Sequence, residues 1–595
     1  MPVLDQRTRY QRTMKFMRLG TRPDTFYTEQ ATRTLISDVP SDLAVQVNDI
    51  TYFLHKFSLL PKCGLLQRLC CNSSSDSEGV SLELHDIPGG EDAFELCAKY
   101  CYGISINISA FNFVPAFCAA KFLQMSESVE KGNLGGKLEA FFDSCILEGW
   151  KDSIVTLQAT SKLPEWAENL GVVRKCIDSI IEKVLTPPPQ VRWSFTYTRP
   201  GYAKKQHHSV PKDWWTEDVS DLDIDLFRCI IMALRATYLL LPQLIGEALH
   251  VYACRWLPGI MKPRTSSSSG SQTEESKAKN RKILETIVTM IPADKGAVSV
   301  GFLLRLLQIS DHFGVSHVTK TELIRRASLQ FDEATVNDLP CASASSMELV
   351  LAVLESYLKL WKRMSPNPAD NSHFLRSIVH VGKLIDSYLQ VVARDDNLPV
   401  SKFVALAEAL PDIARLQHDD LYQAINIYLK AHAELGKADK KRLCRILDCE
   451  KLSAEARAHA VKNELLPLRT VVQLLYFEQE KKSSPSHQHH HHQLHNNHAA
   501  TSSHSNSTAT YKVLKSPHEL SGSEAKHRPR SSNIVAEGNK DRLALEFERK
   551  MIVRGGEVEE VGSDMGRGFC RLGLDPRKIM RRARSDSDYA NKKGR

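Results

Sequence analysis

The order of hydrophobic and polar positions changes period along the chain. Residues 43–47 alternate apolar and less apolar positions, and residues 50–52 begin a second alternating run after the turn-forming pair Asn48-Asp49. Alternation is typical of strands with one buried face, so this stretch predicts a hairpin. Residues 80–84 alternate in the same way and predict a further strand.

A helical period appears in residues 94–101 and then dominates the second half of the chain. The clearest apolar stripe follows the spacing i, i+3, i+4, i+7 and consists of Leu421, Ala424, Ile425 and Tyr428. Such spacing places side chains on one face of a helix. A second stripe begins at Leu443, and the run 471–475 is apolar enough to predict a buried helix.

Sequence motifs in the helical half resemble a known family. The segments KFVALAEALPD, HDDLYQAINIYLKAH and LPLRTVVQLLYFEQ resemble the plant-specific domain of the non-phototropic-hypocotyl family, the BTB/POZ proteins of light and auxin signalling. The segment DWWTEDVSDLDIDLF matches the opening of that domain. The resemblance implies an all-helical domain over residues 213–479, interrupted by a low-complexity loop at 264–280.

The N-terminal half resembles the same family. His55-Lys56 matches its HK pair, Ile87–Gly90 its DIPGG turn and Lys99–Gly103 its K(F/Y)CYG segment. The implied fold is an α+β BTB/POZ domain over residues 37–137. Such domains form homodimers or heterodimers, and many bind a cullin-3 scaffold. The alternative for His55-Lys56 is a structural turn that satisfies a buried polar group.

Composition shifts divide the remaining chain. Residues 1–36 predict a flexible basic N-terminus, and residues 138–212 predict post-BTB helices followed by a linker. In BTB proteins such helices often complete the cullin contact. Residues 480–595 are rich in Ser, His and Asn at first, and predict a mostly disordered tail with a basic C-terminal segment.

Composition favours a cytoplasmic chain without catalytic machinery. The sequence is 42% hydrophobic, has no apolar leader and has no apolar run of the ~18 residues that a membrane span needs. Its 14 cysteines are scattered without zinc-finger spacing, and the His tract 487–492 is a weak, adventitious metal ligand. No P-loop, GxSxG or HExxH motif occurs, so we expect no cofactor, no metal and no enzyme activity.

The basic tail carries nearly all of the net charge of +8, because residues 566–595 hold ten Lys/Arg and three Asp, or 10 − 3 = +7. Five cations interleaved with apolar residues suit an anionic membrane surface, each contributing ~1 kcal/mol: Arg577, Lys578, Arg581, Arg582 and Arg584. Ser585 and Ser587 follow arginines at the spacing of a basophilic kinase site, and the segment resembles a 14-3-3 recognition sequence. The alternative is a solvated tail or a nuclear-import patch. We do not expect the basic tail to bind nucleic acid, because it lacks interleaved aromatic residues or a recognition fold.

Tyr428 is a candidate phosphorylation site, with a packed aromatic side chain as the alternative.

The resemblance implies a substrate-specific adaptor of a cullin-3 ubiquitin ligase in plant light or auxin signalling. Its helical domain would hold a membrane-associated kinase or receptor. The alternative function is a ligase-independent scaffold, peripheral at the plasma membrane, whose basic tail is regulated by phosphorylation and 14-3-3 binding.

Overall fold

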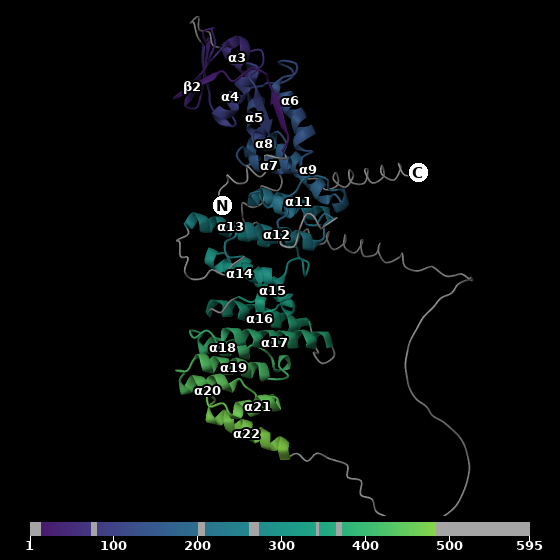
Figure 1. Ribbon diagram of the computed structural model, residues 1–595, viewed down its shortest axis with the longest axis vertical. Helices are drawn as coiled ribbons and strands as arrows, with labels where there is room; N and C mark the ends of the chain where they lie inside the picture. The colour runs from purple at the N-terminus through teal and green to yellow at the C-terminus, as the bar shows by residue number, and fades with distance from the viewer. Residues whose placement is uncertain are drawn as a thin grey trace, which may run out of the picture. The chain divides into compact units, whose positions relative to one another are not determined.

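The computed structural model describes residues 14–72, 80–199, 209–260, 273–340, 344–364 and 372–483 (Figure 1). All strands of these residues lie in the N-terminal part: β1 Phe16–Leu19, β2 Phe26–Glu29, β3 Thr32–Leu35, β4 Leu43–Val47, β5 Ile50–Leu54, β6 Val80–Leu84 and β7 Ile106–Ser109. The helices of the same part are α2 Lys56–Leu59, α3 Gly64–Asn72, α4 Gly90–Cys101, α5 Phe113–Phe122 and α6 Leu134–Phe141, which continues as a π-helical turn over Phe142–Ile146.

The main sheet has five strands in the order β2-β3-β5-β4-β6. The predicted hairpin is confirmed, because β4 and β5 pair antiparallel with Val45 opposite Tyr52. The predicted strand β6 pairs parallel with β4, and its three apolar residues are buried while the two residues between them are exposed. Alternation in the sequence thus corresponds to one buried and one open face.

The N-terminal residues differ from the flexible segment that composition predicts. Strand β1 pairs antiparallel with β7, and β2–β3 form a hairpin whose second strand lies parallel to β5. In addition, the backbone N–H of Lys15 donates to the buried carboxylate of Asp152. The partners of β1 and Lys15 lie about 90 or more residues away, and β3 pairs with a strand outside its own hairpin, so local polarity cannot reveal the order of this segment.

The helices α7 Trp150–Thr160, α8 Pro164–Asn169 and α9 Val172–Leu185 connect the N-terminal part with the second half. The indole N–H of Trp150 donates to the carboxylate of the buried Asp218 at 2.7 Å, and the Trp150 ring lies 4.6 Å from that of Trp214. Residues 191–199, expected as linker, cover this contact, because Trp193 and Phe195 also pack on Trp214. Aromatic packing therefore fixes the boundary between the two halves.

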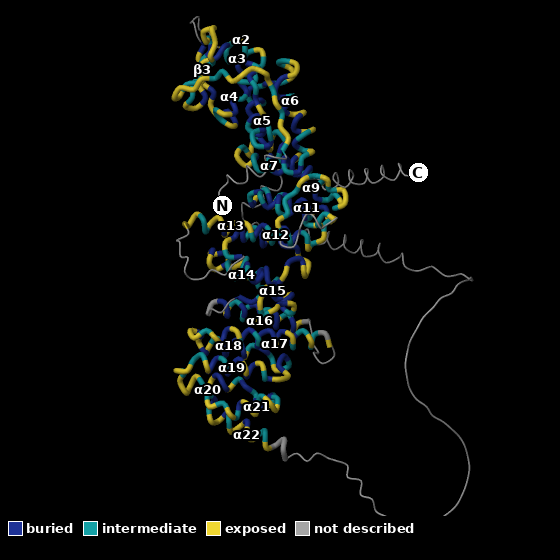
Figure 2. Tube along the Cα trace, in the orientation of Figure 1, coloured by how far each residue is buried: buried dark blue, intermediate teal, exposed yellow. Residues whose placement is uncertain are grey.

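The second half of the described chain is helical: α10 Thr216–Val219, α11 Ile224–Thr237, α12 Pro242–Trp256, α13 Glu274–Met290, α14 Val300–Phe313, α15 His317–Ser328, α16 Ala344–Met364, α17 Ser372–Val392, α18 Val400–Glu408, α19 Asp419–Ala431, α20 Lys437–Arg445, α21 Ala454–Val461 and α22 Leu468–Ser483. Each helix contacts near neighbours in the chain, as α14 contacts α15 and α17 contacts α19, and their buried faces line the interior (Figure 2). Helix α13 begins inside the expected loop 264–280, because Thr273 caps it and two glutamates occupy its first turn.

Helix α19 carries the HDDLYQAINIYLKAH segment of the expected signature. Its predicted stripe is confirmed, with exposed fractions between 0 and 1% for Leu421, Ala424, Ile425 and Tyr428. Helices α17 and α20 contact it. The prediction of a buried helix at 471–475 is wrong in part: helix α22 forms and Leu474 is buried, but Val472 and Leu475 are exposed. No described helix follows α22 to cover its outer face.

Candidate functional site

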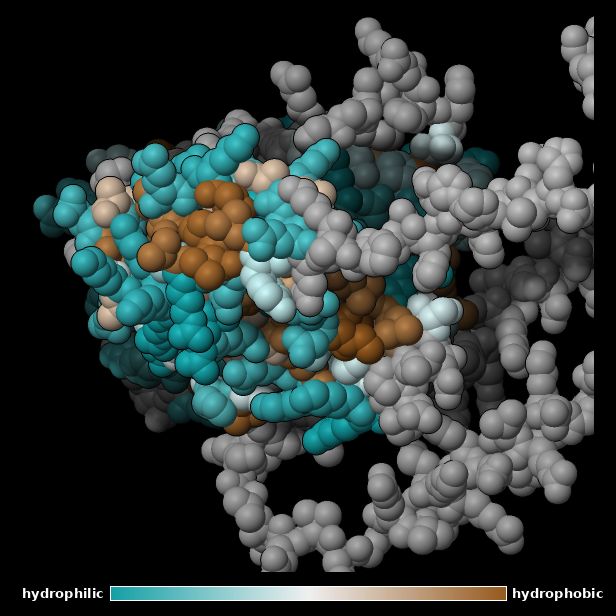
Figure 3. All heavy atoms as spheres, turned by 90° about the horizontal axis from the view of Figure 1, so that it is seen from below, coloured by the Kyte–Doolittle hydropathy of each residue, from teal (hydrophilic) through white to brown (hydrophobic). Residues whose placement is uncertain are grey.

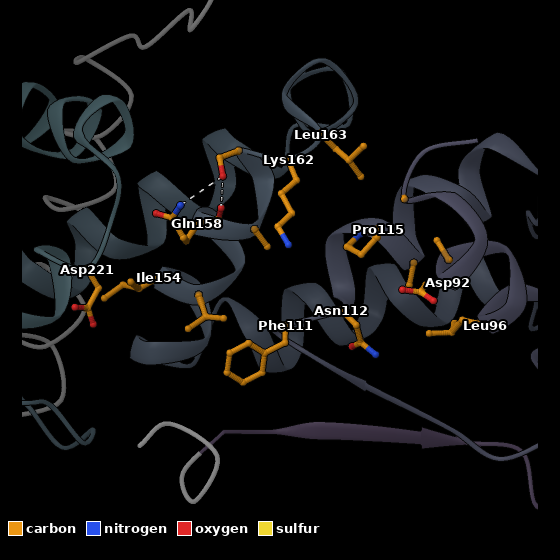
Figure 4. A pocket seen from close by; sticks show the side chains of 16 residues that line it. Asp92, Leu96, Phe111, Asn112, Pro115, Ile154, Gln158, Lys162, Leu163 and Asp221 are labelled. Carbon is orange, nitrogen blue, oxygen red and sulfur yellow. Dashed lines mark hydrogen bonds between the residues drawn. The ribbon is translucent and has the colours of Figure 1, made fainter. Parts of the chain in front are cut away.

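An open groove of about 1050 Å³ lies where the N-terminal part meets the helices that follow it (Figure 4). One wall comes from α4 and from the start of α5. The other comes from α7 and the turn into α8. The groove is thus built mainly by two segments that are separate in the sequence, residues 89–116 and 154–163.

A glycine turn allows the first wall to form. Gly89 precedes α4 with a φ of +87°, in the left-handed region that favours glycine. A Cβ atom at this position would lie 2.7 Å from the Cβ atoms of both Ala93 and Pro115. The glycine pair of the expected DIPGG turn therefore lets α4 approach α5 closely. Leu96, Phe111 and Pro115 remain half-buried on this wall.

The second wall carries an apolar row along α7. Val155, Ala159 and Leu163 follow one another at intervals of four residues, are each half-buried and line the groove. Leu163 precedes α8, which begins with Pro164. The interval of four places Val155 and Ala159 on one face of α7, and Leu163 follows beyond the end of that helix, so the three apolar side chains line the same wall. Such a cleft suits the apolar side chains of a bound helix or extended peptide.

Polar groups fix the second wall and mark its rim. The side-chain amide of Gln158 donates to the Asp223 carboxylate at 3.2 Å, and its carbonyl accepts the Asp223 backbone N–H at 2.8 Å. This pair of bonds ties α7 to the start of α11. Asp92 and Lys162 are exposed on opposite walls (Figure 4). The groove lining contains neither cysteine nor histidine, so its composition favours binding over nucleophilic or metal chemistry.

His55 and Lys56 lie outside the groove lining. The His55 ring is 2% exposed, with Nε2 2.9 Å from the Val39 carbonyl and Nδ1 3.1 Å from the Tyr102 hydroxyl. Since a carbonyl only accepts, Nε2 carries the proton and Nδ1 accepts from Tyr102. The backbone N–H of Lys56 donates to Asp42. Both residues therefore join α2 to the sheet, where they support the fold.

Tyr428 is 1% exposed, and its hydroxyl donates to the Leu398 carbonyl. Phosphorylation there would require the helices to separate, and it stays a prediction. Ser585, Ser587 and the five tail cations lie outside the described residues, as does the His tract. Across the described ranges, no cluster of three or more His, Cys, Asp or Glu is arranged to hold a metal ion. Nor is any helix of these ranges long and apolar enough to cross a membrane.

The fold defines a class of protein: an α+β region and a long helical region, with a partly apolar groove between the α+β region and the helices next to it. The model of the NPH3 family matches residues 213–457. A BTB/POZ domain-containing protein of Arabidopsis thaliana is 63% identical, over 78% of this chain and 85% of that protein. The chain therefore belongs to the plant BTB/NPH3 family.

Other relatives carry names that refer to light responses. The phototropic-responsive NPH3 family protein NPY1 of Arabidopsis thaliana is 39% identical, over 78% of this chain and 82% of that protein. Root phototropism protein 3 of the same organism is 35% identical, over 77% of this chain and 76% of that protein. No solved structure matches the chain.

The groove is the site that sequence reasoning missed. Its walls combine small and apolar residues from separate segments, and no catalytic or ligand motif marks them. Two signals could have pointed to it. The first is the Gly89-Gly90 pair before a helix. The second is the four-residue spacing of Val155, Ala159 and Leu163.

Proposed function

We propose that the chain is a non-enzymatic, substrate-specific adaptor of a cullin-3 ubiquitin ligase in plant light or auxin signalling. The N-terminal part would bind the scaffold, and the helical part would hold a client such as a membrane-associated kinase or receptor. The groove between α4–α5 and α7–α8 is the observation that carries this proposal. It lies where helices that follow a BTB domain would complete a scaffold contact.

The chemistry of the groove supports an apolar anchor with charged flanks. Leu96 and Leu163 stand on opposite walls, so an apolar side chain of the scaffold would lose water on both sides. Asp92 and Lys162 would contact polar residues at the rim. Rim charges affect the association rate more than the affinity, whereas the buried anchors determine the dissociation rate.

Calorimetric titration of the full chain with the N-terminal domain of cullin-3 tests this proposal. We expect micromolar or tighter binding, weakened at least tenfold by Leu96→Glu or Leu163→Glu. Val318→Glu is the matched control, because Val318 is 78% exposed on α15 and lies outside the groove. Circular dichroism confirms that each variant is folded. No binding by the wild type would refute the adaptor function, and equal binding by all variants would refute the groove as the contact.

Dimerisation is part of the same proposal, as homodimer or heterodimer. Large apolar side chains are exposed in the N-terminal part, including Phe16 at 71%, Ile36 at 71% and Phe57 at 65%. Exposed apolar area of this kind is typical of contact surfaces. Sedimentation of the full chain and of a Phe16→Asp, Ile36→Asp variant would show whether these residues are needed.

A second candidate function rests on the excess of seven positive charges in residues 566–595. These charges support a peripheral scaffold at the plasma membrane, released when Ser585 or Ser587 is phosphorylated and bound by 14-3-3. Phosphate beside Arg582 and Arg584 would reduce the attraction to anionic lipid. Truncation before Gly566 followed by membrane fractionation tests this function, and unchanged membrane association would refute it.

A further inference from the structure

The outer face of helix α20 is strongly basic. Four of its nine residues are exposed cations, and we call them the α20 basic face: Lys437, Lys441, Arg442 and Arg445. Lys437, Lys441 and Arg445 follow at intervals of four, so they form a line about 12 Å long on one side of the helix, and Arg442 lies beside it. Leu443 is buried on the opposite side.

The positive charge of this face is not neutralised within the described part of the chain. None of its four cations forms an ion pair with another described residue. The helix also contains Lys440 and a single acid, Asp439, so its net charge is 5 − 1 = +4. Residues 1–565 together carry only 8 − 7 = +1. Helix α20 therefore concentrates positive charge on a body that is otherwise almost neutral.

Helix stability does not account for this arrangement. The helix dipole favours cations in the last turn, where Arg442 and Arg445 lie, but it disfavours Lys437 in the first turn. The intervals of four also make neighbours of like charges twice, once between Lys437 and Lys441 and once between Lys441 and Arg445. Such pairs weaken a helix. Sequence features that oppose local stability are expected at functional sites.

The basic face is accessible in the described structure. Helix α20 contacts α18 and α19, and exposed residues follow its other side (Figure 2). Figure 3 views the molecule from the end at which the last helices of the helical part lie, and shows hydrophilic side chains around hydrophobic patches. No described residue covers the basic face, so it is open to a flat partner.

The geometry of the face fits an extended anionic surface. A single phosphate or carboxylate is held by cations that converge on one point, often with a bidentate arginine. Here the cations are spread along a line, so they would contact several anionic groups at once. A bilayer with anionic lipid presents such groups in one plane and attracts clustered lysines and arginines. Nucleic acid also presents a row of phosphates, but α20 contains no aromatic residue on which a base could stack.

We propose that the α20 basic face binds an anionic membrane surface directly. This inference rests on the second candidate function and does not depend on cullin binding. The basic segment 566–595 and the α20 basic face would attach the chain at two places. Two weak contacts on one chain give stable attachment, because the first raises the effective concentration of the second. The contact through α20 would also set the orientation of the helical part on the membrane.

Co-sedimentation of the full chain with vesicles of phosphatidylserine and phosphatidylcholine tests this contact. The variant Lys441→Gln, Arg445→Gln removes two charges of the face, and glutamine has a similar helix propensity. Each cation near an anionic leaflet strengthens binding about fivefold, so we expect the affinity to fall at least tenfold. Lys359→Gln, Arg363→Gln is the matched control and should bind like the wild type. It removes the same two residue types, at the same interval, from exposed positions on α16.

Stability of the variant separates binding from a structural role. The substitutions in α20 remove like-charged neighbours, so urea denaturation should show a variant at least as stable as the wild type. Lower stability together with weaker binding would mean that the cations support the fold, and would overturn the proposal.

A tail variant separates this inference from the function on which it rests. Arg581→Gln, Arg582→Gln in the full chain should also weaken binding to the vesicles. If only the tail variant loses affinity, the membrane scaffold stands and the contact through α20 is refuted. If the wild type does not bind these vesicles, both are refuted. Equal losses in the α20 and α16 variants would assign binding to total charge. Binding to duplex DNA but not to vesicles, weakened by the α20 substitutions, would assign the face to nucleic acid. Either result would overturn the proposal.

Discussion

Helices α19 and α22 carry similar apolar stripes, but the stripe of α19 is buried and the stripe of α22 is exposed. In α19 the four stripe residues are at most 1% exposed. In α22 the stripe residues are 42–79% exposed: Leu468, Val472, Leu475 and Tyr476. The two helices belong to the same sequence signature and lie fewer than 40 residues apart. The comparison teaches that periodicity assigns residues to a helix face, while the neighbouring helices decide whether that face is buried.

A buried ion pair lies among the residues that pack around α19. The described contacts of α22 include no such pair. Asp386 of α17 and Arg415 are 3% and 8% exposed, and the Arg415 Nε lies 2.9 Å from the carboxylate. Arg415 also donates to the Ala407 carbonyl at 2.6 Å. Helices α17 and α18 are thus joined just before α19 begins.

The largest expected effect comes from breaking this pair. Arg415→Met leaves the Asp386 carboxylate buried without its partner, and we expect a loss of roughly 3–5 kcal/mol in the free energy of unfolding. Urea denaturation followed by circular dichroism measures the loss. The double variant Asp386→Leu, Arg415→Met should recover most of it. Failure to recover would mean that Arg415 acts mainly through Ala407.

The same chemical change in both stripes tests the comparison directly. Leu421→Ala removes a fully buried side chain, with an expected loss of about 2–5 kcal/mol. Leu475→Ala should cost less than about 1 kcal/mol, since Leu475 is 42% exposed. Urea denaturation of the two variants gives both values. Equal losses would show that residues outside the described ranges bury α22 as fully as α19.

Much of the fold follows from local pattern, and the exceptions share one cause. The hairpin at 43–54, strand β6 and the face of α19 could be predicted because their own residues carry the period. The order of β1 and the packing of Trp193 and Phe195 could not, since their partners lie at β7 and Trp214. The groove is also non-local. For His55 the alternative of a satisfied polar group at a structural turn was available from the sequence, but its ring partners Val39 and Tyr102 were not.

Acid should weaken the start of α19 through His418, which is 5% exposed. Burial and, to a lesser extent, the charges of Arg415 and Lys451 lower the pKa of His418 to about 4. Its Nδ1 also accepts the Asp448 backbone N–H, which needs an unprotonated nitrogen.

The unfolded chain therefore binds more protons than the native one between pH ~6.5 and ~4, and stability falls as pH falls through this range. With solvent screening we expect a loss of about 1–2 kcal/mol, and no further loss from this group below pH ~4. Denaturation at pH 7 and pH 5 measures it. His418→Asn keeps a hydrogen-bond acceptor but does not titrate, so this variant should lose less stability than the wild type between pH 7 and pH 5. Equal slopes would exclude His418 as the cause.

The smallest expected difference separates the two stripe tyrosines. Tyr428→Phe removes the hydroxyl that donates to the buried Leu398 carbonyl, and we expect a loss of about 1 kcal/mol. Tyr476→Phe, on a ring that is 60% exposed, should change the free energy of unfolding by less than about 0.3 kcal/mol. Both variants keep the aromatic ring, so the difference isolates the hydrogen bond.

Kinase treatment of native protein gives a second test: a buried Tyr428 hydroxyl should resist modification until denaturant opens the helices. Phosphorylation of Tyr428 in native protein, at the rate seen for Tyr476, would mean that the helices around α19 separate in solution far more readily than their burial indicates.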